Sequence, residues 1–267
     1  LDHVQSTTQF GGMENAGNIF YDENAITGEG KMEALIAHEV AHQWFGNSAS
    51  ESDWKHLWLS EGFATYFTDL YWEDKYGTEA MNERLINERE RVIRFSKKYN
   101  HPVVDTTYES LMVLLNAHSY QKGAWFLHML RNEVGDASFW SGVRMYYETY
   151  KFSNASTSDF QSVMEAETGK DLDAFFHQWL MESQHPILKI KDKSERGFIR
   201  IRQKQKSCLF AFDLEVEVMY ADGTSEMITL SISEKKQKIE LESGKTIKAL
   251  RYDPNVKLLF ERFGKRD

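Results

Sequence analysis

Two histidines four residues apart, with a glutamate beside the first, are the side chains best suited to chemistry here. They are His38, Glu39 and His42, in the stretch AHEVAHQWFGN over residues 37–47. On an α-helix, residues four apart lie about 40° apart around the axis and one turn apart along it, so both imidazoles can reach one ion. Glu39 lies about 60° further round, where it can contact a water on that ion. The spacing therefore predicts a metal site with a proton acceptor beside it.

A third ligand is needed, because a catalytic zinc takes three protein ligands and keeps one position open. Glu61, in the stretch WLSEGFATYF, opens the next predicted helix with eighteen residues between it and His42. If that helix folds back against the first, Glu61 can face the same ion. Two readings stay open at this point. His38 and His42 could be core histidines bonded to carbonyls, and Glu61 a first-turn glutamate favoured by the helix dipole.

The elements that must position these residues differ in the two parts of the chain. Residues 30–183 have helical periodicity, and residues 187–260 alternate as strands do. Asp222-Gly223 and Ser243-Gly244 predict hairpins in the second part. We therefore expect an α+β protein, with a mostly helical domain over residues 1–185 and a small β-sandwich over residues 186–267. After an extended stretch over residues 4–21, helices are expected over residues 31–45, 61–76, 78–98, 119–134, 137–150, 157–167 and 172–182.

The predicted motif helix is apolar on the side away from its histidines, which predicts burial on nearly all sides. The residues on that side include Ile36, Ala37, Val40, Ala41 and Trp44. Histidine and glutamate side chains buried without partners would cost on the order of several kcal/mol, and a bound ion removes that cost. We also expect core positions for Trp44, Trp54, Trp58, His56, His118 and His128, and a solvated helix face over residues 83–94.

Three motifs together resemble the gluzincin metallopeptidases of the aminopeptidase N family, which also includes the leukotriene hydrolase. HEVAHQWFGN with WLSEGFA is similar to the zinc-binding segment of that family. GGMEN, residues 11–15, is similar to its G-x-M-E-N exopeptidase motif, and SYQKGAWFLHMLR, residues 119–131, to the segment with its catalytic tyrosine. The resemblance covers about residues 4–183 and implies a thermolysin-like catalytic domain. The remainder resembles the small β-sandwich domain of the family.

The resemblance implies roles for the residues that match these motifs. His38, His42 and Glu61 would hold one Zn²⁺ per chain. Glu39 would be the general base that takes a proton from the zinc water and passes it to the leaving amine. Tyr120 would donate a hydrogen bond to the developing oxyanion.

The exopeptidase motif adds the substrate side of the implied site. Glu14 would bind the free α-amino group, so that a single residue is removed from the peptide. Met13 would line the pocket for the first side chain, and Gly11 and Gly12 would let the backbone approach the substrate closely. The expected activity is a zinc aminopeptidase that acts on peptides with a free N-terminus. Two alternatives remain, an epoxide hydrolase that uses the same zinc and a non-catalytic scaffold on the same fold.

The bulk properties exclude several other classes of function. The formal net charge is −9 and no run is rich in Lys and Arg, which argues against a nucleic-acid partner. No stretch of eighteen apolar residues exists, so no membrane span is expected. The single cysteine, Cys208, rules out an intrachain disulfide.

The chain departs from the family at its N-terminal side. Only ten residues precede GGMEN, whereas family members carry a large N-terminal β-domain and further strands of the catalytic domain. We therefore expect a fragment that lacks this domain, and we expect the missing domain to pack on the catalytic domain. The first residues show no signal-peptide pattern, so the localisation, cytoplasmic or exported, is left open.

Overall fold

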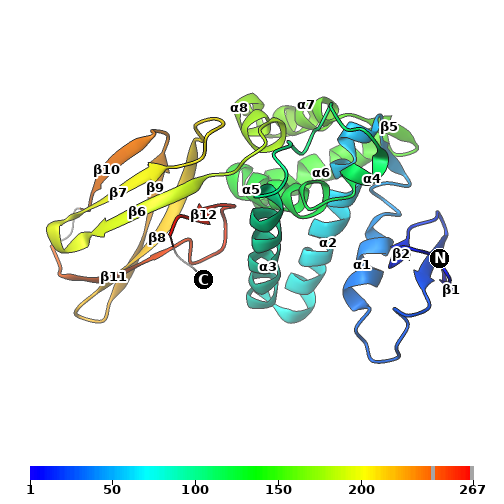
Figure 1. The fold of residues 1–267 in the computed structure, drawn as a ribbon, viewed down its shortest axis with the longest axis horizontal. Helices are drawn as coiled ribbons and strands as arrows, with labels where there is room; N and C mark the ends of the chain where they lie inside the picture. Colours follow the sequence, from blue (N-terminus) through cyan, green and yellow to red (C-terminus); the bar gives the residue numbers. More distant parts are fainter. Residues whose placement is uncertain (242–243, 265–267) are drawn as a thin grey trace. The chain divides into compact units, whose positions relative to one another are not determined.

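The computed structural model describes residues 1–241 and 244–264, and it divides the chain into two compact units, Leu1–Met181 and Glu182–Asp267 (Figure 1). The division lies four residues before the expected boundary at residue 185. Apart from one short 3₁₀ turn, the described helices lie in the first unit, and the second is built of strands. The predicted α+β class is therefore confirmed. No helix among the described residues is long and apolar enough to cross a membrane.

The first unit opens with a small sheet and continues as a bundle of helices. In the sheet, β2 (Gly12–Met13) is an edge strand that pairs with β3 (Asn18–Asp22), which also pairs with β1 (Asp2–Ser6). Two further short strands, β4 (Ala49–Glu51) and β5 (Ser153–Ala155), pair in parallel. The α-helices are α1 (Glu33–Ala41), α2 (Trp58–Tyr76), α3 (Thr78–Ser96), α4 (Leu111–Leu114), α5 (Gly123–Val134), α6 (Asp136–Tyr150), α7 (Thr157–Thr168) and α8 (Asp173–Phe176).

Helix α1 is shorter than predicted, because the chain turns sharply after it. The backbone amide of Asn47 donates to the carbonyl of His42, and that of Gly46 to the carbonyl of Ala49. Gly46 adopts φ 125°, a conformation that side-chain-bearing residues rarely adopt. Two other predicted helices contain π-helical turns, η2 (His118–Lys122) before α5 and η3 (His177–Met181) after α8. Such turns are frequent at functional sites.

The prediction that the motif helix is buried on nearly all sides is wrong. Ile36 is 38% exposed and Trp44 is 49% exposed. Together with α2 and α6, this apolar side of α1 lines an open groove of about 980 Å³. Trp54 is also exposed, so of the three tryptophans expected in the core only Trp58 lies there. Periodicity identified the apolar side correctly, but no described element covers it.

The core of the first unit is centred on α2. Trp58 and Phe63 on this helix contact aromatic rings of α5, α6 and α7. Helices α2 and α5 cross closely at two glycines, since a Cβ atom on Gly62 would lie 3.0 Å from the backbone of Gly123. The histidines expected in the core are hydrogen-bonded there, His56 to Thr157, His118 to Ser96 and His128 to Tyr66.

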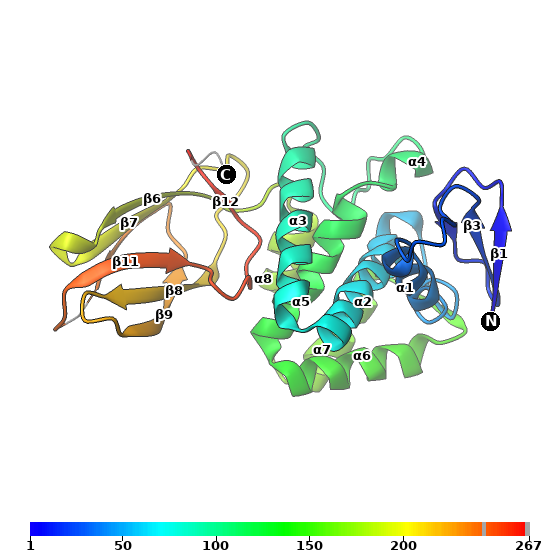
Figure 2. The same cartoon turned by 90° about the horizontal axis from the view of Figure 1, so that it is seen from below.

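The second unit is a β-sandwich of two sheets, as predicted (Figure 2). One sheet has the order β10-β7-β6-β12 and the other β11-β8-β9. The strands are β6 (Ile187–Lys193), β7 (Phe198–Gln203), β8 (Phe212–Tyr220), β9 (Ser225–Ile232), β10 (Lys236–Glu240), β11 (Ile247–Tyr252) and β12 (Glu261–Arg262).

One of the two predicted hairpins is confirmed. Asp222-Gly223 connects β8 to its antiparallel neighbour β9. The prediction for Ser243-Gly244 is wrong, because β10 and β11 belong to different sheets, and Ser243 itself lies outside the described residues. The alternating pattern of β10 and β11 shows which side chains point inward, but it does not show which strand each one pairs with.

Candidate metal centre and active site

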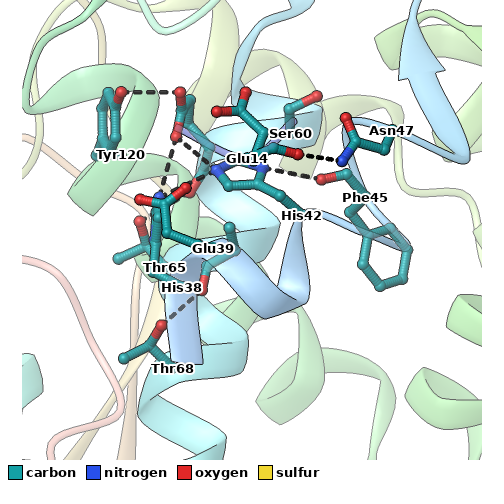
Figure 3. A network of polar contacts seen from close by, with 12 residues as sticks. Glu14, His38, Glu39, His42, Phe45, Asn47, Ser60, Thr65, Thr68 and Tyr120 are labelled. Carbon is teal, nitrogen blue, oxygen red and sulfur yellow. Dashed lines mark hydrogen bonds and ion pairs between the residues drawn. The ribbon is translucent and has the colours of Figure 1, made fainter. Parts of the chain in front are cut away.

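Three side chains from two helices meet at one point (Figure 3). His38 lies on α1, His42 follows its last residue, and Glu61 lies in the first turn of α2. The Nε2 atom of His42 lies 3.1 Å from Nε2 of His38 and 3.2 Å from Oε2 of Glu61, and the His38–Glu61 distance is also 3.2 Å. Donors bound tetrahedrally at about 2.0–2.1 Å from zinc would lie about 3.3–3.4 Å apart. The triangle of donor atoms therefore has the size that a zinc ion requires.

The orientation of His42 supports the same interpretation. Its Nδ1 atom lies 3.0 Å from the carbonyl oxygen of Phe45, which can only accept, so Nδ1 donates. In the neutral ring, Nε2 then carries a lone pair that points at His38 and Glu61. A hydrogen bond from the other ring nitrogen is the usual arrangement for a metal-bound histidine. Gly46 lies against this ring, since a Cβ atom there would be 3.0 Å from Nδ1.

The electrostatics of the three ligands favour a positive charge where they meet. Burial lowers the pKa of His38. Burial acts in the same sense on His42, but the hydrogen bond and charge of Glu61 outweigh it and raise the pKa of His42 to about 9. Burial opposes ionisation of Glu61, yet hydrogen bonds from both imidazoles lower its pKa to about 2. A proton or a metal cation at this point would satisfy the same carboxylate.

Glu39 lies beside this triangle but is not part of it. Its side chain is buried, and burial raises its pKa to about 7. Gly12 on β2 lies directly against it, because a Cβ atom on this glycine would overlap the carboxylate of Glu39. Gly11, by contrast, has ordinary space around it, with Leu35 at 3.8 Å. The close approach that Gly12 permits is therefore to Glu39.

Tyr120, in the π-turn η2, donates from its hydroxyl to Oε1 of Glu61 over 2.8 Å. Its ring stacks on His38 with the centroids 5.9 Å apart. Burial raises the pKa of Tyr120, and the charge of Glu61 adds to the rise, so the phenol keeps its proton and remains a donor. The glycine crossing of α2 and α5 brings η2 close enough for this contact.

Two residues that the sequence interpretation missed hold the segment GGMEN in place. The side-chain amides of Gln43 and Asn47 both donate to the backbone carbonyl of Glu14, over 3.1 and 2.5 Å. Gln43 also accepts from the backbone amide of Gly17. These contacts tie the segment after β2 to the C-terminal end of α1. Gln43 and Asn47 both belong to the motif HEVAHQWFGN. Their position close to the histidines in the sequence was the signal that could have identified them.

All nine predicted site residues line one cleft of about 500 Å³. They are Gly11, Gly12, Met13, Glu14, His38, Glu39, His42, Glu61 and Tyr120. The cleft continues along α2 past Thr65 and Thr68 to Arg84, Glu88 and Arg91 on α3. The structure thus brings together residues that lie more than one hundred positions apart in the chain.

Most charged side chains over residues 83–94 are exposed, as expected, but the wall that α3 contributes to the cleft also contains a buried acid. Glu88 is 6% exposed, and it lies against the fully buried Asp69 on α2. Arg84 donates from Nε to Oδ1 of Asp69 over 2.7 Å. Burial raises the pKa of Asp69 to about 6 and raises that of Glu88 as well, which favours a proton shared between the two carboxyl groups. The charges that surround Glu88 in the sequence are mostly exposed, so single-sequence patterning did not indicate that this residue lies against Asp69.

Comparisons with known proteins identify the family. The model of the peptidase family M1 domain matches residues 3–179. The chain is 31% identical over 265 residues to a probable aminopeptidase 2 of Sulfurisphaera tokodaii, a match that covers 91% of this chain and 32% of that protein. It is 30% identical over 255 residues to glutamyl aminopeptidase of Bos taurus, covering 87% of this chain and 26% of that protein. The chain belongs to peptidase family M1.

Two further comparisons concern another curated relative and a solved structure. The chain is 31% identical over 258 residues to the tricorn protease-interacting factor F2 of Thermoplasma volcanium, covering 90% of this chain and 31% of that protein. The crystal structure of Legionella pneumophila aminopeptidase A in complex with aspartic acid has a TM-score of 0.76 at 16% identity, covers 99% of this chain, and shares its fold. The chain spans about a third or less of the length of these proteins.

Proposed function

We propose that this chain carries the catalytic centre of a zinc aminopeptidase, which removes the first residue from peptides with a free N-terminus. The observation that supports this most directly is the triangle formed by His38, His42 and Glu61, with Glu39 and Tyr120 on its borders. These three ligands would hold one Zn²⁺ and leave a position open toward the cleft. A zinc ion there supplies a Lewis acid that acidifies water and polarises a carbonyl group.

Glu39 is the proton carrier of the proposed reaction. It accepts a proton from the attacking water and gives it to the leaving amine. A carboxyl group with a pKa of about 7 suits this task, because a group that exchanges protons in both directions works best near the ambient pH. Because Glu39 lies beside the proposed metal ligands and is not one of them, its carboxylate is free to accept and release this proton.

Tyr120 stabilises the charge that forms on the scissile carbonyl oxygen. Its raised pKa keeps the phenol protonated, and its hydroxyl lies at the metal ligands, 2.8 Å from Glu61. A donor directed at the developing oxyanion contributes about 3 kcal/mol to catalysis in other hydrolases. When substrate is bound, the Tyr120 hydroxyl releases Glu61 and donates its hydrogen bond to the scissile carbonyl oxygen instead.

Glu14 and strand β2 position the substrate. The clamp from Gln43 and Asn47 fixes the backbone of Glu14, and its carboxylate lies in the cleft for the α-ammonium group. β2 lies at the edge of its sheet, where the substrate backbone can add as a further strand. Met13 faces the same cleft and lines the pocket for the first side chain. The relatives named as aminopeptidases support the same class of substrate.

The proposal is tested with leucine p-nitroanilide and its N-acetyl derivative. We expect the zinc-loaded protein to cleave the free amine and to leave the acetylated compound intact. Glu14→Gln should reduce this preference by raising KM for the free amine, whereas Glu23→Gln, an exposed glutamate outside the cleft, should not. Absence of hydrolysis with zinc bound would favour a scaffold, and hydrolysis of a lipid epoxide alone would favour the epoxide hydrolase.

The role of Tyr120 has its own test. Tyr120→Phe removes the hydroxyl but keeps the ring that stacks on His38. We expect kcat to fall by about 10²–10³-fold with little change in KM, as for the loss of one oxyanion donor. A rise in KM at unchanged kcat would contradict oxyanion stabilisation and would assign the tyrosine to substrate binding.

A further inference from the structure

An array of cations covers the outer side of one sheet of the second unit. Three neighbouring strands each contribute two exposed basic side chains, which we call the basic face. The register places Arg202 opposite both Lys189 and Lys236, and Arg200 opposite both Lys191 and Lys238. The basic face thus consists of two rows of three cations, Lys189–Arg202–Lys236 and Lys191–Arg200–Lys238, on β6, β7 and β10.

These cations have few partners within the protein. Of these six cations, only Lys238 forms an ion pair with a described residue, Glu240. Lys189 lies over the ring of Phe263, and Arg200 over that of Phe198. No described side chain forms a hydrogen bond or ion pair with Lys191, Arg202 or Lys236. Like charges directly opposite on neighbouring strands destabilise a sheet, so the array costs folding stability that these contacts offset only in part.

The basic face is hollow. A cavity of about 430 Å³ lies among its six cations, with Gln237 and Ile201 as the other lining residues. The two guanidinium groups stand on the central strand β7, and the four lysines flank them on β6 and β10. Arginine binds phosphate and carboxylate through two parallel hydrogen bonds, and lysine adds mobile point charges around such a contact. The layout is that of a binding site for a multiply charged anion.

We propose that the basic face binds a compact anion that carries three or more phosphate groups. The choice follows from charge density. Neighbouring strands are about 4.8 Å apart and alternate residues about 6.8 Å apart, so six positive charges stand on an area of roughly 10 by 7 Å. A phosphate monoester carries about −1.5 to −2 at neutral pH, so three or four clustered groups match the array.

Longer polyanions match the array less well. An extended acidic peptide presents a side chain to one face only about every 7 Å, so it would place about two carboxylates on the basic face. One strand of a nucleic-acid duplex carries a charge about every 3.4 Å of axis, and about three would reach the array. Of the six cations, the peptide would leave about four and the nucleic acid about three without a counter-charge.

The test compares the protein with two double variants by calorimetric titration against inorganic tripolyphosphate. Arg200→Gln with Arg202→Gln removes the central guanidinium groups. Lys248→Gln with Arg251→Gln removes the same charge from β11 in the other sheet and is the matched control. All four positions are exposed, so both variants should fold, and both retain His38, His42 and Glu61. A difference between them therefore cannot come from phosphate at the metal ligands.

We expect one tripolyphosphate per chain, bound about tenfold or more weaker by the R200Q/R202Q variant and within about twofold of normal by the control. Orthophosphate and a hexaglutamate peptide should bind at least about tenfold more weakly than tripolyphosphate. An equal loss in both variants would overturn the proposal, because it would reduce the effect to net charge. Tighter, face-dependent binding of hexaglutamate, single-stranded RNA or anionic vesicles would also overturn it, in favour of a macromolecular surface.

Discussion

In the candidate metal centre, the donor atoms of His38, His42 and Glu61 lie 3.1–3.2 Å from one another. On the basic face, by contrast, Lys191, Arg202 and Lys236 form no hydrogen bond or ion pair with a described side chain. The first group joins opposite charges in a buried site. The second places like charges side by side on an exposed sheet. Buried ionisable groups are stable only when they are paired, whereas solvent weakens the interactions between exposed charges. Both groups favour a ligand of the opposite charge, a cation in one case and an anion in the other.

The charge balance of the two units follows the same division. Residues 1–181 contain 14 Lys and Arg against 27 Asp and Glu, and residues 182–267 contain 18 against 14. The net charge of −9 is therefore the sum of a strongly acidic unit and a mildly basic one. A prediction based only on the net charge of the whole chain does not reveal this difference between the two units. Our expectation that no nucleic acid binds used the total charge and the absence of a basic run, and neither property reports on a sheet face.

Removing one donor from the buried triangle should have the largest effect. Glu61→Ala leaves two imidazoles without their carboxylate, so we expect zinc content to fall from about one ion per chain to well below half, with loss of peptidase activity. Metal analysis of dialysed protein measures this. Glu73→Ala, further along α2 and outside the cleft, is the control and should keep its zinc. Normal zinc content in the Glu61 variant would show that the three donors do not act as one site.

A smaller effect is expected when the triangle is kept and the neighbouring acid is changed. Glu39→Gln preserves shape but cannot accept a proton, so kcat should fall by about 10²–10⁴-fold while zinc content is unchanged. Steady-state hydrolysis of leucine p-nitroanilide, with metal analysis of the same sample, checks both statements. Near-normal turnover would move the role of base to another group and would separate Glu39 from the metal centre.

The Asp69–Glu88 pair tests whether buried charges in the first unit are paired through a proton. Both pKa values are raised above their ordinary values of 3.8 and 4.5. The stability that the pair contributes is therefore fully present below about pH 4 and lost as the pH rises through about 6. Glu88→Gln removes one of the two acids and leaves Asp69 with Arg84 as its charged partner. The difference in the free energy of unfolding between the variant and the wild type should therefore shift in favour of the variant by about 1–3 kcal/mol from pH 5 to pH 8.

Thermal unfolding at these two pH values measures that gain. A change of this size corresponds to a few degrees in Tm, roughly 2–4 °C per kcal/mol for a chain of this length. Glu90→Gln, an exposed substitution on the same helix, should follow the wild type at both pH values. Parallel behaviour of the Glu88 variant and the wild type would mean that the two acids do not share a proton in the folded protein.

The smallest effect is expected on the basic face without its anion. Arg200→Gln with Arg202→Gln relieves like-charge contacts across three strands, so the free energy of unfolding should rise by about 0.2–1 kcal/mol. Chemical denaturation at low salt measures this, and the gain should shrink at high salt because exposed charges are screened. A loss of stability instead would show that the arginines make packing contacts that outweigh their repulsion.

The grouping of His38, His42 and Glu61 could be predicted from the sequence because its geometry is mostly local. His38, Glu39 and His42 are fixed relative to one another by one helical turn, and Glu61 by a short connection to the next helix. The motifs of Glu14 and Tyr120 were identified by resemblance alone, and all these residues line one cleft. The nine residues were thus predicted as one group, although their separate roles remain proposals.

The features that were missed depend on contacts between distant parts of the chain. Nothing near Glu88 indicates that it faces Asp69 across two helices, and nothing near Lys236 indicates that it stands beside Arg202. The exposure of Ile36 and Trp44 was missed for a related reason, because periodicity identifies an apolar side but not whether another element covers it. The hairpin predicted at Ser243-Gly244 failed because strand pairing is likewise non-local.

Under the proposed function, the contact between Gly12 and Glu39 would link substrate binding to proton transfer. Because a methyl group on Gly12 would displace the carboxylate of Glu39, the strand proposed to bind the substrate backbone also sets the position of the proposed proton acceptor. Under the proposed function, a substitution at Gly12 would therefore alter proton transfer even if it left the contacts with the substrate unchanged. A new substrate preference at β2 can therefore evolve only through substitutions that leave space for the Glu39 carboxylate beside residue 12.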